Sequence, residues 1–486
     1  MCGIVGILYF DRQHCVDPLV LKRMADVIAH RGPDDEGFFL KGNIGMGHRR
    51  LSIIDLDTGH QPISNEDGAC QIVYNGEIYN FNELRGDLQK RGHNFKTKSD
   101  TEVIVHAYEE FGPQCVRLLN GMFAFAIWDD RNKTLFIARD RLGIKPLFYY
   151  IDNEKFVFAS ELKAIFELPG VNKEINLVAL DAFFSYGYIP DPLTPYKLCY
   201  TLLPACYMVV STQGIKSQCY WSLNYDTGEG AKQKEITYYR DTLHNILTDA
   251  VKRCLISDVE VGILLSGGLD SSSVVAITAK RLGHTVKTFT VKGGPGLYDE
   301  TNYARTVAVH CNTIHYETEV EIKSIRELLP ELLHYLDEPF ADSSIIPTYY
   351  VCKMASEQVK VALSGEGGDE IFAGYPTYDR FKQVNIIKKL FPRFFLQMIH
   401  CCADILIRGR DDGLGDLGKI VKRIRSVTEY SMYPPGNIFE RLRTLFSTKQ
   451  KMKIYGERLR PYVGQSTNFI SEHFCSMPGI QTDVSL

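Results

Sequence analysis

The hydrophobic pattern changes near residue 235, and this change constrains the fold more than any other feature of the 486-residue chain. Before it, short β-rich runs such as 3–9 and 122–128 are separated by dense turn residues, with helical patterns between them. After it, apolar strand-like runs such as 259–265 and 359–363 alternate with helical patterns. The first pattern is typical of a layered α+β domain, and the second favours a parallel sheet in a doubly wound α/β domain.

The element pattern therefore predicts two domains, at 2–220 and 235–486, joined by a polar linker at 224–235. In the first part we expect strands at 3–9, 71–74, 122–128, 134–138 and 156–159, and helices at 20–29, 82–91 and 101–111. In the second we expect strands at 259–265, 286–291 and 359–363, and helices at 238–254, 271–281 and 300–310.

Composition excludes several classes of protein. Hydrophobic residues make up 45% and charged residues 23% of the chain, which argues against a disordered, collagen-like or coiled-coil protein. The formal charge of −4 gives no global basic field that would attract nucleic acid or acidic lipid. The N-terminus lacks the cationic start of a signal peptide, and no apolar run reaches the roughly 20 residues of a membrane span. With thirteen cysteines and no zinc-like spacing, we expect a reduced, cytoplasmic protein.

Cys2 is the first residue whose position suggests chemistry. Its small side chain permits removal of Met1, which would place a thiol and an α-amine on one residue. An α-amine titrates near pH 8, so it can accept the thiol proton and later return it to a leaving amine. Its position alone favours the other interpretation, a cysteine that begins a buried strand, because free cysteines are commonly buried.

Five segments resemble the class II glutamine amidotransferases, and they occur in the same order as in that family. The segments are MCGIVG (1–6), HRGPD (30–34), HRRLSIID (48–55), YNGEIYN (74–80) and SDTE (99–102). The resemblance implies an N-terminal nucleophile fold with layered αββα architecture. It also implies that Cys2 attacks the side-chain amide of glutamine and releases ammonia.

The same resemblance implies a role for each glutamine-site residue. Arg50 would hold the α-carboxylate through its planar fork, and Asp100 would hold the α-amine. The Asn75 side-chain amide and the Gly76 N–H would form the oxyanion hole. Taken singly, Asn75-Gly76 is also typical of a hairpin turn, and Arg50 or Asp100 of a solvated charge. The expected glutamine-binding residues are Arg50, Leu51, Ile54, Asn75, Gly76, Glu77 and Asp100.

A glycine-rich loop at 264–272, LLSGGLDSS, follows a predicted strand and opens a predicted helix. Backbone N–H groups in such a turn bind phosphate, and the helix dipole adds to the attraction. No lysine follows the glycines as it does in the Walker pattern, which argues against a kinase or an ordinary ATPase. The loop instead resembles the pyrophosphate loop of ATP pyrophosphatases, which implies that Asp270 helps to hold Mg²⁺. The alternative is a flexible Gly-Ser turn.

A second loop at 362–375 places three carboxylates among glycines, and carboxylates beside a phosphate site favour a divalent metal. Both loops, with 290–291 and 337–347, resemble asparagine synthetase. The resemblance implies that Glu366 takes part in acyl-adenylate formation and ammonia attack, and that 337–347 lines the acceptor pocket; alone, 337–339 is typical of a helix end. The expected ATP-binding residues are Leu264, Ser266, Gly267, Gly268, Asp270, Ser271, Val291, Ser364 and Gly365, and the expected metal ligands are Asp270 and Asp369.

Together these segments imply a ligase that resembles the glutamine-hydrolysing asparagine synthetases. Its expected small-molecule partners are L-glutamine, L-aspartate, ATP and Mg²⁺, and ammonia would pass from Cys2 to the activated carboxylate through an apolar passage. A homodimer is an open question. About 110 residues follow Tyr375, so we expect a second domain that is shortened relative to the family. The shortening leaves open a glutaminase or an ATP-binding regulatory chain without synthetic activity. The segments HRRLSIID (48–55) and DEPFADSS (337–344) also resemble amidotransferases of polysaccharide biosynthesis, which leaves open the amidation of another carboxylate.

Overall fold

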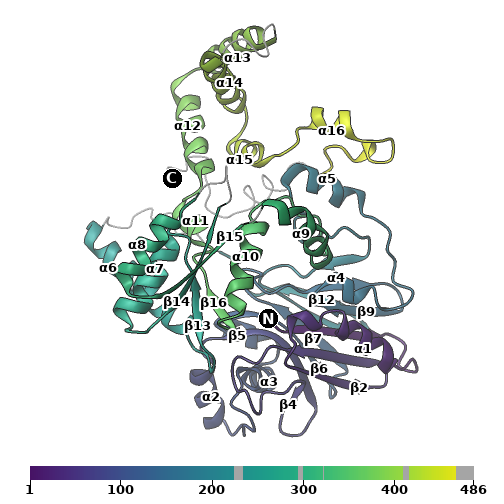
Figure 1. The fold of residues 1–486 in the computed structure, drawn as a ribbon. Coiled ribbons are helices and arrows are strands. Elements are labelled where there is room, and N and C mark those ends of the chain that lie inside the picture. The colour runs from purple at the N-terminus through teal and green to yellow at the C-terminus, as the bar shows by residue number, and fades with distance from the viewer. Residues whose placement is uncertain (224–233, 294–298, 321, 409–414, 467–486) are drawn as a thin grey trace. The chain divides into compact units, whose positions relative to one another are not determined.

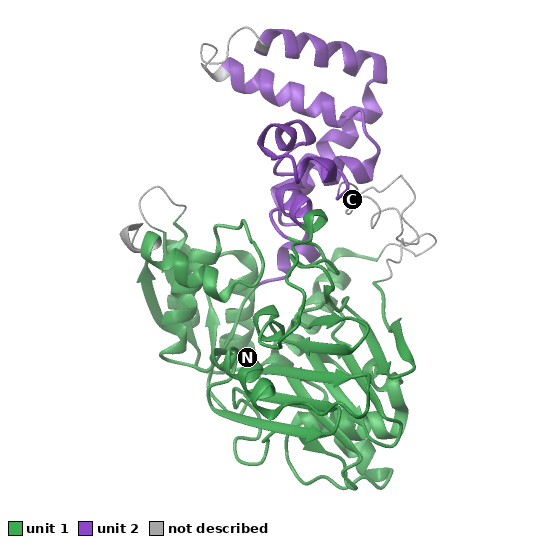
Figure 2. Ribbon diagram, turned by 90° about the vertical axis from the view of Figure 1, so that its right-hand side faces the viewer, with its two compact units in different colours: residues 1–179, 189–223, 233–365 green, residues 180–188, 224–232, 366–486 purple. Residues whose placement is uncertain are grey.

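The computed structural model describes residues 1–223, 234–293, 299–320, 322–408 and 415–466. These residues form two compact units (Figure 2): unit 1 comprises the described residues of 1–179, 189–223 and 234–365, and unit 2 those of 180–188 and 366–466. Most of the expected linker, 224–233, lies outside the described residues.

Two six-stranded antiparallel sheets form the first part of unit 1 (Figure 1). The first sheet has the order β10-β8-β9-β1-β3-β2 and the second has the order β12-β11-β7-β6-β5-β4. The first-sheet strands are β1 (Gly3–Tyr9), β2 (Asp35–Lys41), β3 (Ile44–Arg50), β8 (Phe148–Ile151), β9 (Lys155–Ala159) and β10 (Cys199–Thr201). The second-sheet strands are β4 (Ile63–Ser64), β5 (Cys70–Ile78), β6 (Gly121–Asp129), β7 (Thr134–Arg139), β11 (Cys206–Ser211) and β12 (Gly214–Cys219).

Helices cover the outer face of each sheet. The helices α1 (Pro18–Asp26) and α4 (Leu162–Ile165) share a core with the first sheet. The helices α2 (Phe81–Lys90) and α3 (Asp100–Phe111) share a core with the second sheet. A third apolar core, which includes Ile4 of β1, lies between the two sheets. Because β1 is buried on both faces, its sequence is almost continuously apolar, and the expected αββα layering is confirmed.

The second part of unit 1 is built on a four-stranded parallel sheet with the order β15-β14-β13-β16. The helices α7 (Leu269–Ala276) and α8 (Thr301–Cys311) pack on one face, and α10 (Ile345–Ser356) packs on the other. The expected doubly wound α/β fold is therefore confirmed. Its strands are β13 (Val261–Leu264), β14 (Lys287–Lys292), β15 (Ile314–Glu319) and β16 (Val361–Leu363).

Two elements of this sheet matter for the site. The strand order reverses between β13 and β16, and ligands of such sheets bind beyond the carboxyl ends of the strands at this switch point. β15 lies at the edge of the sheet and has the polar sequence IHYETE, so the hydrophobic pattern did not predict it. The remaining helices of unit 1 are α6 (Ile236–Cys254) and α9 (Ile322–Tyr335).

Unit 2 is helical in its described residues. Its helices are α11 (Gly368–Phe372), α12 (Pro376–Leu390), α13 (Arg393–Arg408), α14 (Gly415–Tyr430), α15 (Pro435–Arg443) and α16 (Thr448–Ile454), and it includes the end of α5 (Leu177–Tyr186). The Lys451 ammonium is buried and lies 2.8 Å from Asp181 Oδ1, which ties α16 to α5. No single helix among the described residues has the length and apolar character of a membrane span; 368–390 and 393–407 pass that test only together, across a bend of 119°.

Cys206 and Cys219 form a disulfide between the neighbouring strands β11 and β12. The expectation of a reduced protein with thirteen free thiols is wrong for this pair. The pairing depends on the register that places Cys206 directly opposite Cys219, with their Cα atoms 4.0 Å apart. No cysteine spacing in the sequence reveals such a register.

Candidate active site

One pocket in the first part of unit 1 gathers residues from four separate segments of the chain. The residues are Cys2, Arg50, Leu51, Ile53, Ile54, Gly59, Gln61, Tyr74, Gly76, Glu77, Ser99, Asp100 and Thr101. All the expected glutamine-binding residues except Asn75 line it, together with the expected nucleophile Cys2. The pocket lies where the start of β1, the end of β3, the middle of β5 and the start of α3 come together.

Cys2 is held by the Leu51 backbone at its thiol and by the Arg31 side chain at its carbonyl oxygen. The Leu51 N–H donates to Cys2 Sγ at 3.4 Å, and the Arg31 Nε–H donates to the Cys2 carbonyl oxygen at 3.0 Å. Burial raises the pKa of the Cys2 thiol, so its deprotonation needs a base close by. Burial also lowers the pKa of the N-terminal amine, carried by Met1, to about 6, so this amine is largely unprotonated at neutral pH.

Arg50 is fixed by the loop that follows it. Its Nη2 group donates to the carbonyl oxygens of Ile54 at 3.2 Å and Asp55 at 2.5 Å. Gly59 leaves the room for this guanidinium, since a Cβ atom at position 59 would lie 2.3 Å from Arg50 Nη2. Arg50 is only 6% exposed, so the reading of it as a solvated charge is wrong.

Asn75 and Gly76 lie inside β5 and pair with β6, so the reading of them as a hairpin turn is wrong. A Cβ atom at position 76 would lie 2.2 Å from the Met122 carbonyl oxygen, which explains the glycine. Asn75 is 1% exposed, and its Nδ2 atom has no hydrogen-bond partner among the described residues. A buried amide without a partner is unusual, and Asn75 therefore offers a donor to a bound ligand.

Asp100 begins α3, just after the Ser99 side chain that caps this helix. Its Oδ2 atom accepts hydrogen bonds from the Tyr74 hydroxyl at 2.9 Å and from the Ile78 N–H at 3.0 Å. Burial raises the pKa of Asp100, and burial together with the Asp100 charge raises the pKa of Glu77 well above its usual range. Both carboxyl groups face a site that favours a cationic ligand, because a cation would offset the cost of their ionisation.

Sequence reasoning gave no role to two cations beside the nucleophile. Arg31 holds the Cys2 carbonyl and also donates from Nη1 to Glu161 Oε1 at 2.9 Å. Lys145 is 5% exposed, its Nζ atom lies 3.1 Å from Met1 Sδ, and burial lowers its pKa. The quoted motif HRGPD contains Arg31 and could have flagged it, whereas no sequence pattern marks Lys145.

The first glycine loop connects β13 to α7 at the carboxyl edge of the parallel sheet. Gly267 adopts φ +89°, and a Cβ atom there would lie 2.6 Å from the Ala304 backbone nitrogen. The Gly268 N–H donates to Ser266 Oγ at 3.2 Å, and Ser266 Oγ lies 3.0 Å from Ser271 Oγ. The loop therefore forms an ordered turn at a helix N-terminus, which argues against the flexible-turn alternative.

The second loop meets the first at the strand-order reversal. Gly365 follows β16, and a Cβ atom there would lie 2.6 Å from the Ser271 backbone nitrogen. Ser364 and Gly365 thus lie in unit 1 beside the start of α7. The expected residues Leu264 and Val291 lie at the ends of β13 and β14, on the same edge of the sheet.

The other expected residues of the second loop belong to unit 2. Glu366 and Asp369 lie in that unit, whereas Asp270 lies in unit 1. Asp369 is held within its own unit, because its carbonyl oxygen accepts from the Gly374 N–H at 3.0 Å. The expected metal pair of Asp270 and Asp369 stays a prediction.

Two contacts inside unit 1 join its antiparallel and parallel parts. Asp258, just before β13, accepts a hydrogen bond from the Asp55 N–H at 2.7 Å and donates one to the Ile53 carbonyl oxygen at 3.0 Å. Asp337, in the segment expected to line the acceptor pocket, lies 3.2 Å from Lys163 Nζ. The loop that fixes Arg50 is therefore bonded directly to the residues that lead into β13.

Comparison with known protein families gives one match for the antiparallel part of the chain and another that includes its parallel part. Residues 1–221 match the family model of a glutamine amidotransferase domain, and residues 242–414 match the asparagine synthase model. The putative glutamine-hydrolysing asparagine synthetase 2 of Methanocaldococcus jannaschii is 39% identical over 418 residues, which cover 81% of this chain and 79% of that protein.

Two relatives from Bacillus subtilis are longer than this chain. The glutamine-hydrolysing asparagine synthetase 1 is 37% identical and the synthetase 3 is 35% identical, and each match covers 78% of this chain. The matches span 59% and 64% of those two proteins, which is less than two thirds of their length. From the two matched models and the archaeal relative, the chain belongs to the family of glutamine-hydrolysing asparagine synthetases.

Proposed function

We propose that this chain makes asparagine from L-aspartate, glutamine and ATP, with glutamate, AMP and pyrophosphate as the other products. The observation that carries the proposal is the pocket that brings together a held thiol, a buried guanidinium and a buried carboxyl group. The unpartnered amide of Asn75 belongs to the residue that precedes Gly76 of the pocket lining. Hydrolysis of glutamine by a thiol needs a nucleophile, a cation for the α-carboxylate, a donor for the oxyanion and an anion for the α-amine, and the four groups can supply these in turn. We assign the glutaminase domain to 2–220 and the synthetase domain to 235–486.

In the glutaminase half, Arg50 binds the α-carboxylate of glutamine and Asp100 binds its α-amine. The cationic amine compensates for the burial that raises the pKa of Asp100. After removal of Met1, the amine of Cys2 takes the thiol proton, and the thiolate attacks the side-chain carbonyl carbon. Asn75 Nδ2 and the Gly76 N–H stabilise the oxyanion, the amine returns the proton to the departing ammonia, and water releases glutamate from the thioester.

In the synthetase half, the turn at 266–268 and the start of α7 bind the phosphates of ATP. Asp270 and Asp369 would hold Mg²⁺, which neutralises phosphate charge when it is bound. The remaining expected ATP-binding residues, Leu264, Val291, Ser364 and Gly365, contact the nucleotide. Glu366 assists formation of the aspartyl-adenylate and the attack of ammonia on it.

The two reactions share ammonia, which must reach the adenylate before bulk water protonates it. We therefore propose an apolar passage between the glutaminase and synthetase sites. We also propose a cytoplasmic location, because ATP and glutamine are cytoplasmic metabolites, and interaction with small molecules rather than with nucleic acid. The assembly that we propose is a homodimer, and sedimentation of the purified chain would test this oligomeric state.

The test is a product balance with the full chain, glutamine, Mg-ATP and L-aspartate. We expect asparagine, AMP and pyrophosphate in equal amounts, with glutamate formed at least as fast. Formation of AMP with another carboxylate but not with aspartate would favour the polysaccharide alternative. Glutamate release without AMP, for any carboxylate in a panel, would leave a glutaminase only. Asp270→Asn is the matched control, because it should remove AMP formation and spare glutaminase activity.

A further inference from the structure

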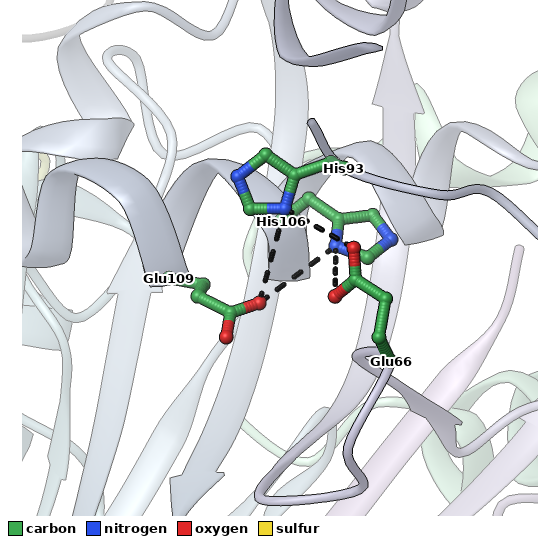
Figure 3. A group of neighbouring side chains, drawn as sticks. All are labelled: Glu66, His93, His106 and Glu109. Atoms are coloured by element: carbon green, nitrogen blue, oxygen red, sulfur yellow. Dashed lines mark hydrogen bonds and ion pairs between the residues drawn. The ribbon is translucent and has the colours of Figure 1, made fainter. Parts of the chain in front are cut away.

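A second polar cluster lies outside the glutamine pocket and includes two residues from the second half of α3. It consists of Glu66, His93, His106 and Glu109 (Figure 3). Glu66 lies in the loop between β4 and β5, His93 follows α2, and both His106 and Glu109 lie on α3. Each residue offers one ligand atom, and these four atoms lie within 4.8 Å of one another.

The distances in this cluster suit a small tetrahedral cation. Glu66 lies 3.3 Å from His93 Nδ1 through Oε1 and 3.2 Å from His106 Nδ1 through Oε2, and both Nδ1 atoms lie 3.9 Å from Glu109 Oε2. Tetrahedral zinc with ligands at about 2.0–2.1 Å places its ligand atoms about 3.3 Å apart. Figure 3 shows both rings turned toward the two carboxylates. With one ligand atom from each residue, the four atoms lie within 4.8 Å of one another and must draw closer to reach this spacing.

The buried atoms of the cluster lack ordinary hydrogen bonds. His106 is 0% exposed, and neither of its ring nitrogens has a hydrogen-bond partner among the described residues. Glu109 Oε2 is also buried without such a partner. Buried polar atoms are hydrogen-bonded in the great majority of cases. The two His106 ring nitrogens lie 3.2 Å and 3.5 Å from carboxylate oxygens of Glu66 and Glu102 without the geometry of a hydrogen bond, so this group has room for a cation.

The surroundings orient the ligands from outside. His106 Nε2 lies 3.5 Å from Glu102 Oε1, and His93 Nε2 lies 3.5 Å from Glu110 Oε2. Metal-binding histidines commonly present their second ring nitrogen to a carboxylate in this way, which leaves the other nitrogen free for the metal. Arg131 Nη2 lies 3.0 Å from Glu109 Oε1 and holds that carboxylate in place.

We propose that Glu66, His93, His106 and Glu109 bind one Zn²⁺ ion in a structural site. Two imidazoles and two carboxylates suit zinc, whereas Mg²⁺ and Ca²⁺ prefer oxygen ligands only. The ion would join two loops to α3, and the first residue of α3 is Asp100 in the glutamine pocket. The site therefore stabilises the segment that positions Asp100, and it takes no part in the chemistry at Cys2.

Zinc titration of the full chain, stripped with a chelator, tests the site. We expect about one Zn²⁺ per chain and a rise in melting temperature that Mg²⁺ does not produce. His93→Gln should lose the bound zinc and the zinc-induced rise, while His284→Gln, at an exposed histidine elsewhere in unit 1, should keep both. Glu110→Gln should weaken zinc binding by about 10- to 100-fold through the lost outer carboxylate.

Cobalt distinguishes this site from adventitious binding by thiols. Co²⁺ bound to two imidazoles and two carboxylates gives visible bands without sulfur-to-cobalt charge transfer. Glu109→Gln should weaken those bands, and it serves as the test variant where His93→Gln does not fold. The proposal fails if the wild-type chain binds no stoichiometric zinc. It fails equally if His93→Gln binds zinc as tightly as wild type, or if the cobalt spectrum shows thiolate bands. In those cases the cluster is a set of contacts between histidines and carboxylates that holds no metal ion.

Discussion

The proposed glutamine pocket and the proposed ATP loops would bind charged ligands by different means. The glutamine pocket relies on buried side chains: Arg50, Asn75 and Asp100 are 6%, 1% and 4% exposed and are fixed by strands or a helix start. The ATP loops rely on the backbone of 266–268 and on glycines that allow two segments to approach closely. One site is preorganised by buried charge, and the other by the shape of the main chain.

The difference predicts how each site responds to substitution. A buried charged group raises the free energy of the folded protein until a ligand of opposite charge binds to it. Its substitution should therefore strongly affect the reaction at its own site and leave the reaction at a distant site unchanged. The glutamine pocket lies wholly in unit 1, whereas the residues assigned to ATP and catalysis extend into unit 2 with Glu366 and Asp369. Variants of the first site should therefore separate the two half-reactions cleanly.

Cys2→Ala gives the largest expected effect, because it removes the nucleophile itself. Loss of a catalytic nucleophile commonly lowers kcat by about 10⁴-fold or more, so glutamine-dependent asparagine formation should become undetectable. Synthesis from ammonium chloride should persist, because the ATP loops do not involve Cys2. AMP release with each nitrogen donor measures both. Glutamine use by this variant would show that another group is the nucleophile.

Asn75→Ala should give the next largest effect. Removal of one oxyanion donor typically costs about 10²- to 10³-fold in kcat, and the unpartnered Nδ2 atom is the donor that this substitution deletes. The KM for glutamine should change little, since Arg50 and Asp100 stay in place. Steady-state glutaminase kinetics check the split between kcat and KM. A rise in KM at unchanged kcat would assign Asn75 to ground-state binding instead.

The sequence was sufficient to predict strands and site residues where a segment has a strong hydrophobic period or a specific chemical motif. The strand Gly3–Tyr9 follows from its continuous apolar run, and the order of the motifs predicted that Arg50, Gly76 and Asp100 would belong to one site. The expected strand 122–128 is likewise the centre of β6. The apolar strands follow from neighbouring residues alone, and the ordered motifs are specific enough to identify a known family.

Features that depend on distant contacts were not predictable. Gly59 matters only because Arg50 occupies the space beside it, and Lys145 is buried among residues far from it in the sequence. The edge strand Ile314–Glu319 is held by main-chain pairing with β14 and has little apolar pattern of its own. The histidines His93 and His106 come together only through the packing of the segment after α2 on α3.

Gly267→Ala tests the other side of the comparison, where the backbone makes the site. Alanine is disfavoured at φ +89°, and its Cβ would meet the Ala304 nitrogen at 2.6 Å, so the loop must move. A strain of about 1–3 kcal/mol corresponds to roughly 5- to 150-fold weaker ATP binding, with glutaminase activity unchanged. Gly283→Ala is the matched control, because Gly283 also has positive φ but has open space around it. Equal ATP affinity in both variants would contradict the assigned role of the loop.

His48 gives the smallest and most specific test of buried polarity in the glutaminase half. It is 1% exposed on β3, its Nε2 atom lies 3.0 Å from the Tyr74 carbonyl oxygen, and burial lowers its pKa to about 3. Above about pH 6.5 the imidazole is neutral in both folded and unfolded chains and has no effect on the pH dependence of stability. As the pH falls toward 3, the unfolded chain binds a proton that the folded chain excludes, so stability decreases by about 1.4 kcal/mol per pH unit. Hydrogen exchange of the β3 amides, corrected for intrinsic rates, should show this slope between pH 6 and pH 5. His48→Gln should flatten it, since a neutral amide does not titrate; an unchanged slope in the variant would assign the pH dependence to another group.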